Sequence, residues 1–205
     1  MKDYLKKNLK NKKLDLVILA GGKGTRIKQY LKGLSKPMAR FNDKYFLEYI
    51  IQSYSKYNFN KIYILTGYRS NNIFKKFNKK IYNFIEIECL KEKKLLGTGG
   101  ALYKLKQKKV EDFILLNGDT IFDINLTNLI KSKNKNALGS IALIKNISNK
   151  KNNKLNNLKI SNNCLLHDEY GKLMNGGIYY FKKDIFKYIK NKKISLESEI
   201  LPDLI

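Results

Sequence analysis

Short apolar runs alternate with helix-like stretches along the first half of the chain. Runs rich in Val, Ile, Leu and Phe are typical of strands. The predicted strands are residues 14–20, 61–67, 85–90 and 112–119. Apolar residues recur at helical spacing over 45–57, 72–77 and 101–107. Strands that alternate with helices predict βαβ units, and therefore an α/β, doubly wound fold with a mostly parallel sheet.

The second half of the chain is less regular. Strands are predicted over 140–146, 157–162 and 176–181. The Lys/Asn-rich stretch at 145–157 is typical of a solvated loop. A helix is predicted over 184–191, and another begins near Ser195, which is a suitable N-cap. We divide the chain into a basic N-terminal extension, 1–13, and one domain, 14–205.

Composition places the chain among globular proteins. Of its 205 residues, 43% are hydrophobic, enough for one core. The net charge of +25 raises the question of nucleic-acid binding. Lysines, however, occur in every segment of the chain, and Asn, Ile and Tyr are also abundant. A gene rich in AT codons would give this composition. We therefore expect no specific nucleic-acid partner, although a positive field attracts anionic substrates.

The few cysteine and histidine residues limit the metal sites and disulfides that the chain can form. Cys89 and Cys164 form no C-x-x-C pair and His167 is the only histidine, so neither a zinc site nor a disulfide framework is expected. No apolar run reaches the roughly 18 residues of a membrane span. The N-terminus lacks the apolar segment of a secretory signal. We expect a cytoplasmic protein without a membrane partner.

The sequence GGKGTR follows the first predicted strand directly. Gly21, Gly22 and Gly24 allow backbone N–H groups to approach an anion, and the start of the following helix favours negative charge. Thr25 adds a hydroxyl donor and Arg26 a planar fork suited to phosphate. The segment is not a Walker A loop. It predicts a phosphate site, with an ordinary glycine turn as the alternative.

Two further segments supply charge. Pro37 stiffens the chain after Lys36, whose ammonium can neutralise a phosphate under attack. Asp119 ends the strand at 112–119 in an Asn-Gly-Asp turn, where a carboxylate can hold Mg²⁺. A turn aspartate is the alternative. Because ligands bind at the carboxyl ends of parallel strands, we expect the glycine loop and Asp119 to converge on one sheet edge.

Two weaker glycine motifs lie further on. The sequence LGTGGA opens the helix predicted at 101–107, and its glycines would let a base or ribose lie against the backbone. A helix-start turn explains it equally well. In MNGG, the amide of Asn175 stands beside Gly176 and Gly177 and can hydrogen-bond sugar hydroxyls. A β-turn is the alternative there.

Together and in this order, these segments resemble the sugar-phosphate nucleotidyltransferase family. The matching stretches are LAGGKGTRI (19–27), SKPMARFNDKYFLEYII (35–51), ECLKEKKLLGTGGAL (88–102), LLNGDTIFD (115–123), NGGIYYF (175–181) and SLESEILPDLI (195–205). Within the family the chain is most similar to D-glycero-D-manno-heptose 1-phosphate guanylyltransferases. The cue is K-P-M-A running into F-L-E-Y, with L-G-T-G-G-A further on.

The resemblance implies a Rossmann-like nucleotidyltransferase (GT-A-like) fold with a mixed, mostly parallel sheet. It implies transfer of a nucleoside monophosphate from an NTP, GTP favoured, to a heptose or hexose 1-phosphate. Pyrophosphate leaves, and the NDP-sugar serves surface polysaccharides such as lipopolysaccharide or capsule. The attacking group is the sugar phosphate oxygen, so no protein nucleophile is needed and catalysis is positioning with charge neutralisation. A homodimer is one possible assembly.

The resemblance also assigns roles to residues. Arg26 would contact the leaving phosphates, Lys36 the α-phosphate and Asp119 the Mg²⁺ cofactor. The implied nucleotide-binding residues are Gly21, Gly22, Gly24, Thr25, Glu92, Gly97 and Thr98. The implied sugar-binding residues are Asn175, Gly176 and Glu197.

The chain also departs from the family pattern. Leu95 stands where a proline is common, and residues 167–172 replace a glutamate-lysine pair, which affects the sugar pocket. We expect the chain to lack the family's C-terminal segment with its second metal-binding aspartate. Asp123 is expected to cap a helix starting near Leu126, and Asp203 lies in a helical setting.

Three other functions compete with this one. The first is a degenerate paralogue that binds nucleotide without turnover, and the second is another specificity, such as mannose-1-phosphate guanylyltransferase. A molybdenum-cofactor guanylyltransferase is the third, but there the lysine follows the arginine more closely than Lys36 follows Arg26.

Overall fold

The computed structural model describes residues 14–22, 24–31, 33–132, 136–145, 156–162, 164–168 and 170–205. For residues 25, 26, 28, 156 and 157 it describes the backbone and not the side chain. The predicted extension at 1–13 and most of the predicted loop at 145–157 lie outside the described residues. Within the described ranges, none of the helices has the length and apolar character of a membrane crossing.

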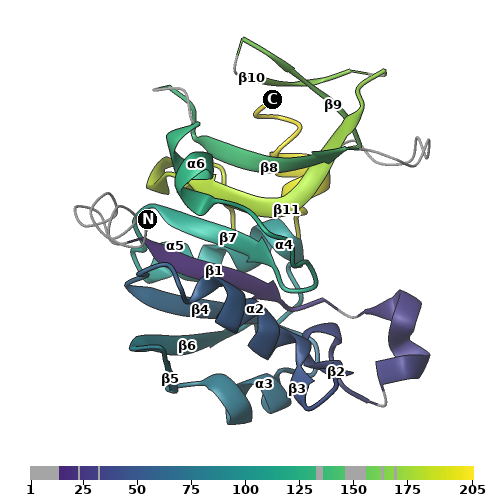
Figure 1. Cartoon of the computed structure of the whole chain (residues 1–205), viewed down its shortest axis with the longest axis vertical. Helices are drawn as coiled ribbons and strands as arrows, with labels where there is room; N and C mark the ends of the chain where they lie inside the picture. The colour runs from purple at the N-terminus through teal and green to yellow at the C-terminus, as the bar shows by residue number, and fades with distance from the viewer. Residues whose placement is uncertain are drawn as a thin grey trace.

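Four parallel strands form the centre of the sheet (Figure 1). In spatial order they are β7 (Phe113–Asn117), β1 (Asp15–Ala20), β4 (Lys61–Thr66) and β6 (Ile85–Lys91). All four were predicted from apolar runs. Near-continuous apolar sequence suits β1, β4 and β7 because helices cover both sheet faces, whereas β6 alternates buried and exposed residues.

Antiparallel strands extend the sheet on both sides. On the β7 side, β11 (Leu173–Phe181) pairs antiparallel with β7, β8 (Gly139–Lys145) and β9 (Asn156–Ser161), and β9 pairs with β10 (Cys164–His167). On the other side, β5 (Ile81–Tyr82) pairs antiparallel with β6. A separate hairpin joins β2 (Arg40–Phe41) and β3 (Lys44–Tyr45). The sheet is therefore mixed but mostly parallel at its core, which confirms the predicted fold class.

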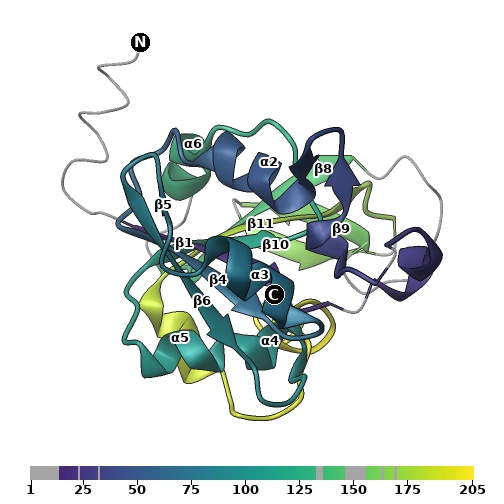
Figure 2. The same cartoon turned by 90° about the horizontal axis from the view of Figure 1, so that it is seen from below.

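Helices cover the two faces of the sheet, as the view from below shows (Figure 2). Successive β1 side chains pack on opposite faces of the sheet. Leu16 and Ile18 belong to one hydrophobic core, and Val17 belongs to the other. The first core includes α2 (Phe46–Tyr54), α3 (Ser70–Phe77) and α6 (Leu126–Lys131). The second includes α4 (Gly97–Ala101), α5 (Tyr103–Gln107), η3 (Lys183–Lys187) and η4 (Leu196–Ile200). This is the doubly wound arrangement.

The C-terminal helices differ in type from those predicted. The expected helix at 184–191 is a short 3₁₀ turn, η3. The helix after Ser195 is one turn of π-helix, η4, and Ser195 caps it as predicted, because its Oγ accepts from the Ser198 N–H at 3.1 Å.

Asp123 does not cap the helix near Leu126, so that prediction is wrong. The cap is Asn125, whose Oδ1 accepts from the Asn128 N–H at 3.2 Å. Asn125 directly precedes the first helical residue, where a short side chain reaches the third N–H of the helix. The Asp123 side chain is 99% exposed and lies 4.0 Å from Lys56 Nζ.

The helix expected after the glycine loop is also different. The chain forms a 3₁₀ helix, η1 (Thr25–Leu31), with a kink at Ile27 (φ −118°, ψ 15°), and then a second 3₁₀ turn, η2 (Lys36–Met38). A kinked 3₁₀ segment aligns fewer free N–H groups than an α-helix, so the loop itself must supply most donors to an anion.

Candidate active site

The carboxyl ends of the parallel strands open into one cavity of about 660 Å³. Gly21 follows β1, Glu92 follows β6, and Gly118 and Asp119 follow β7; all four residues line the cavity. Leu19 of β1 is in register with Asn117 of β7, so the glycine loop and the Asn-Gly-Asp turn leave the sheet side by side. Their predicted convergence on this edge is confirmed.

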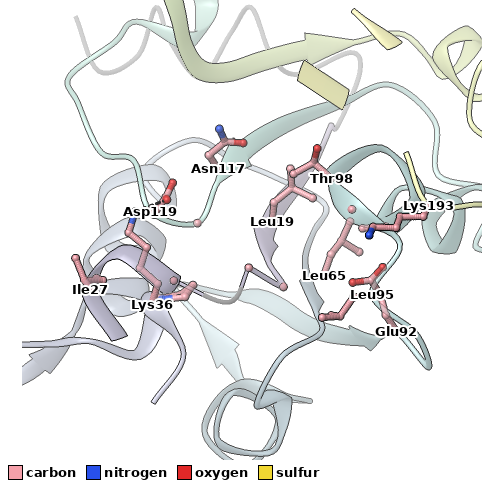
Figure 3. A pocket seen from close by; sticks show the side chains of 17 residues that line it. Leu19, Ile27, Lys36, Leu65, Glu92, Leu95, Thr98, Asn117, Asp119 and Lys193 are labelled. Carbon is pink, nitrogen blue, oxygen red and sulfur yellow. Dashed lines mark hydrogen bonds and ion pairs between the residues drawn. The ribbon is translucent and has the colours of Figure 1, made fainter. Parts of the chain in front are cut away.

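Lys36 and Asp119 form a charge pair in the cavity wall (Figure 3). Lys36 Nζ donates to Asp119 Oδ2 at 2.5 Å, and both side chains remain about 40% exposed (39% and 41%). Pro37 is buried at the second position of η2, and its fixed φ restricts the backbone beside Lys36. At Gly118 a Cβ would lie 2.4 Å from the Leu19 carbonyl oxygen, so only glycine permits the tight turn that directs Asp119 inward.

The glycine loop forms the floor beside this pair. Gly21, Gly22 and Gly24 all line the cavity. Gly24 has φ +60°, and a Cβ there would approach Lys36 Cβ to 3.0 Å, so the loop packs closely against the lysine. The side chains of Thr25 and Arg26 lie outside the part of the chain that the structure describes, so the roles predicted for them stay predictions.

Glu92 lies away from the charge pair, beside the apolar side chains of Leu65 and Leu95 (Figure 3). It is only 8% exposed, and its Oε1 accepts from the Leu96 N–H at 3.2 Å. Burial raises the pKa of this carboxyl, while the Leu96 N–H and the charge of Lys104 act against the rise. A buried carboxylate can accept hydrogen bonds from a ligand but can donate none while ionised.

The glycines of LGTGGA serve packing as well as the cavity. Gly97 and Thr98 line the cavity, but at Gly100 a Cβ would lie 2.4 Å from the Lys192 carbonyl oxygen. The N–H of Gly99 donates to the Ile194 carbonyl at 3.0 Å. Gly99 and Gly100 therefore make room for the segment 192–194. The expectation that glycines of this motif let a base or ribose lie against the backbone stays a prediction.

This packing brings Lys193 into the cavity wall (Figure 3). Sequence reasoning missed it, since one lysine among 42 basic residues carries no local signal.

Glu197 lies behind Thr98. The Thr98 hydroxyl donates to the Glu197 carboxylate and accepts from the Leu196 N–H at 2.9 Å. Ser195 Oγ donates to the same carboxylate oxygen at 3.3 Å. These bonds join η4 to α4, and Glu197 is not among the residues that line the cavity. Its predicted contact with the sugar stays a prediction.

Asn175 and Gly176 lie on β11 and do not line the cavity. The Asn175 amide is engaged within its own strand: Nδ2 donates to the Tyr179 hydroxyl at 2.7 Å, and Oδ1 accepts from the Gly177 N–H at 2.9 Å. Another asparagine, Asn117, does line the cavity. Its place in the Asn-Gly-Asp segment was the available signal, but only the aspartate was singled out.

Asp119 is the residue that could hold a divalent cation. Within the described ranges no three His, Cys, Asp or Glu side chains gather into a metal site, and neither Asp123 nor Asp203 lines the cavity. One carboxylate facing an open cavity is nevertheless compatible with Mg²⁺, which retains waters and completes its shell with substrate phosphate oxygens. The donor set therefore fits a cation that arrives with a nucleotide.

Comparison with known proteins gives consistent matches. The Nucleotidyl transferase family matches residues 16–163. D-glycero-alpha-D-manno-heptose 1-phosphate guanylyltransferase of Campylobacter jejuni is 36% identical over 191 residues, covering 90% of this chain and 83% of the relative. Bifunctional protein GlmU of Methanocaldococcus jannaschii is 31% identical over 191 residues, covering 91% of this chain. The chain spans only 44% of that GlmU protein.

A solved structure agrees with these sequence matches. The crystal structure of HddC from Yersinia pseudotuberculosis complexed with GMP-PN superposes with a TM-score of 0.72 at 25% identity. The match covers 94% of this chain and 87% of that one.

Proposed function

The chain belongs to the nucleotidyl transferase family, and from that premise we propose that it transfers GMP from GTP to a heptose 1-phosphate. The products are pyrophosphate and a GDP-heptose for surface polysaccharide synthesis. The observation that carries the proposal is the Lys36–Asp119 pair beside the glycine loop, at the carboxyl edge of the parallel strands. The Campylobacter relative, 36% identical, is named for this base and sugar.

The reaction needs charge neutralisation and alignment more than covalent catalysis. A phosphate oxygen of the sugar 1-phosphate attacks the α-phosphorus, and the bond from that phosphorus to the bridging oxygen of the β-phosphate breaks. Lys36 neutralises charge that develops on the α-phosphate, while the backbone N–H groups of Gly21, Gly22 and Gly24 hold the triphosphate. Arg26 would contact the leaving pyrophosphate.

A divalent cation completes the proposed site. Asp119 would hold Mg²⁺, which supplies further charge neutralisation and orients phosphate oxygens. The Asp119 carboxylate also forms an ion pair with Lys36. Mg²⁺ and the Lys36 ammonium would therefore both contact the Asp119 carboxylate. The negative charge of a bound triphosphate would balance the remaining positive charge of these two groups.

Glu92 is the proposed base-selecting residue. The Watson–Crick edge of guanine presents two N–H donors beside one carbonyl, whereas uracil and thymine present one donor between two carbonyls. An ionised carboxylate offers acceptors only and so matches guanine. The second oxygen of Glu92, Oε2, lies near Gly21 and Gly67, where the missing Cβ atoms leave space around it.

The decisive experiment is a pyrophosphate-release screen of four NTPs against heptose, mannose and glucose 1-phosphates. Release with GTP and heptose 1-phosphate is the expected result. If GTP is turned over with mannose 1-phosphate and with no other sugar, the sugar substrate in this proposal becomes mannose 1-phosphate. GTP binding without pyrophosphate release for any sugar would favour a nucleotide-binding protein without turnover.

A further inference from the structure

Asn117 carries a polar atom without a partner. Its side chain ends β7 and lines the cavity, between Asp119 and Thr98 in the view of Figure 3. The Oδ1 atom is buried and accepts no hydrogen bond from the part of the chain that the structure describes. Buried carbonyl oxygens normally have donors, because an unpaired one has lost its hydration without compensation. A molecule in the cavity can supply that donor.

The other half of this amide is held by β11. Gly177 has φ +73°, and a Cβ there would lie 2.8 Å from Asn117 Nδ2, so glycine leaves the space that the amide occupies. The buried Tyr179 hydroxyl accepts from Asn175 Nδ2 at 2.7 Å. Burial raises the pKa of Tyr179, and hydrogen bonds from the Asn175 and Asn117 side chains act against that rise. The amide nitrogen of Asn117 therefore faces β11. Its buried Oδ1 is the atom of this cavity-lining side chain that still needs a donor.

The sheet order indicates which substrate reaches Asn117. The strands run β11-β7-β1-β4-β6 across the cavity edge. The glycine loop follows β1 and Glu92 follows β6, so the proposed nucleotide site extends from β1 towards β6. Asn117 lies on β7, on the opposite side of β1 from that site. This side of the cavity is left for the second substrate of the proposed reaction, the sugar 1-phosphate, whose hydroxyl groups are hydrogen-bond donors.

We propose that Asn117 Oδ1 accepts a hydrogen bond from a hydroxyl group of the sugar 1-phosphate. The Asn-Gly-Gly segment at 175–177 then serves the sugar site by positioning Asn117. Asn117 is a sugar-specificity residue, and Gly177 and Tyr179 are positioning residues. This inference rests on the proposed function and adds to it the residue that recognises the sugar.

The test measures binding and turnover separately. Calorimetry in the presence of a non-hydrolysable GTP analogue gives the affinity for D-glycero-D-manno-heptose 1-phosphate and for its monodeoxy analogues, and pyrophosphate release gives kcat/KM. We expect one deoxy analogue to bind the wild-type protein about tenfold more weakly, the value of one neutral hydrogen bond. In Asn117→Ala that analogue and the parent sugar should bind equally, while the KM for GTP changes by less than about twofold.

Two further variants separate recognition from folding. Tyr179→Phe keeps the buried ring but removes the hydroxyl that holds the Asn117 amide, so it should reduce the same discrimination. Thr127→Val is the matched control, because Thr127 Oγ1 is also buried and has no hydrogen bond among the described residues, but lies on α6 outside the cavity lining. It should leave sugar discrimination unchanged.

The outcomes distinguish this inference from the proposed function. Discrimination that persists in both Asn117→Ala and Tyr179→Phe, or a loss of GTP affinity in place of sugar affinity, overturns the inference alone. Sugar binding that depends on Asn117 without pyrophosphate release supports the inference and contradicts the proposed reaction.

Discussion

At the scale of single residues, the phosphate-neutralising charges should control rate more than stability. Lys36→Ala and Arg26→Ala are each expected to lower kcat by about 10²–10³, the usual effect of removing one preorganised contact at a reacting centre. Lys36 and Asp119 are both partly exposed, so losing their ion pair should cost only about 0–1 kcal/mol of stability.

Steady-state kinetics with circular dichroism will check this prediction. Lys187→Ala is the control, since Lys187 forms an exposed ion pair with Asp184 and does not line the cavity. Near-normal turnover in the folded Lys36 and Arg26 variants would remove both residues from the mechanism.

Glu92 predicts a change in base preference. Glu92→Gln keeps an oxygen for the Leu96 N–H but replaces an acceptor by an NH₂ donor. Selectivity for GTP over UTP should fall by at least about tenfold, since a two-bond base contact discriminates by about 1–3 kcal/mol. Competing-substrate assays measure this ratio, and an unchanged ratio would place guanine recognition elsewhere.

The same residue predicts how stability varies with pH. Because burial raises the pKa of Glu92, the folded protein binds this proton more tightly than the unfolded chain does. Wild-type stability therefore falls as pH rises from the ordinary value of about 4.5 through the raised pKa, and Glu92→Gln lacks this loss. Urea unfolding at several pH values should show the variant gaining stability relative to wild type as pH increases. A stability difference between Glu92→Gln and wild type that stays constant with pH would contradict the assignment.

At the scale of elements, α4 packs closely against the segment 192–194 at the site. Alanine normally stabilises a helix relative to glycine by about 0.5–1 kcal/mol. At Gly100, however, a Cβ would lie 2.4 Å from the Lys192 carbonyl, and such overpacking costs about 1–3 kcal/mol. Gly100→Ala should therefore lower the free energy of unfolding and displace Lys193 from the cavity.

Gly22→Ala is the control in denaturant titrations. Nothing lies within 4 Å of its Cβ position, so the free energy of unfolding should not change. Equal stability of the two variants would show that α4 and the segment 192–194 do not pack closely at Gly100.

Elements with a strong local pattern were predictable, and those formed by pairing alone were not. Three of the parallel strands are short apolar runs and the fourth, β6, alternates apolar and polar residues, so their type followed from the local pattern. The two-residue strands β2, β3 and β5 are too short to show alternation, and they exist because a neighbouring strand offers hydrogen bonds. For the same reason the four residues of β10, which pair with β9, were missed.

At the scale of the whole molecule, the charge of +25 predicts weak, sequence-blind DNA binding. Counterion release would supply the affinity, so binding should fall steeply between about 50 and 200 mM salt. Fluorescence anisotropy with two unrelated duplexes measures this. Nanomolar binding to one sequence at physiological salt would instead indicate a dedicated nucleic-acid surface.

The sequence by itself determined the parallel core and the edge on which the chemistry gathers. Apolar runs ending in glycine or aspartate place Gly21 and Asp119 after strands, and parallel strands align their carboxyl ends whatever the rest of the chain does. The ion pair between Lys36 and Asp119, which are 83 positions apart, was not predicted; only their separate roles toward phosphate and Mg²⁺ were.

Only the tertiary structure decided which polar groups face the cavity. Glu197 bonds to Thr98 from 99 positions away, Lys193 reaches the cavity through packing against Gly100, and Asn117 lines it while Asn175 does not. These positions cannot be predicted from the local sequence, because each depends on how closely two segments that are distant in the sequence approach each other. That distance is determined by packing across the whole domain, which periodicity and motif spacing do not encode.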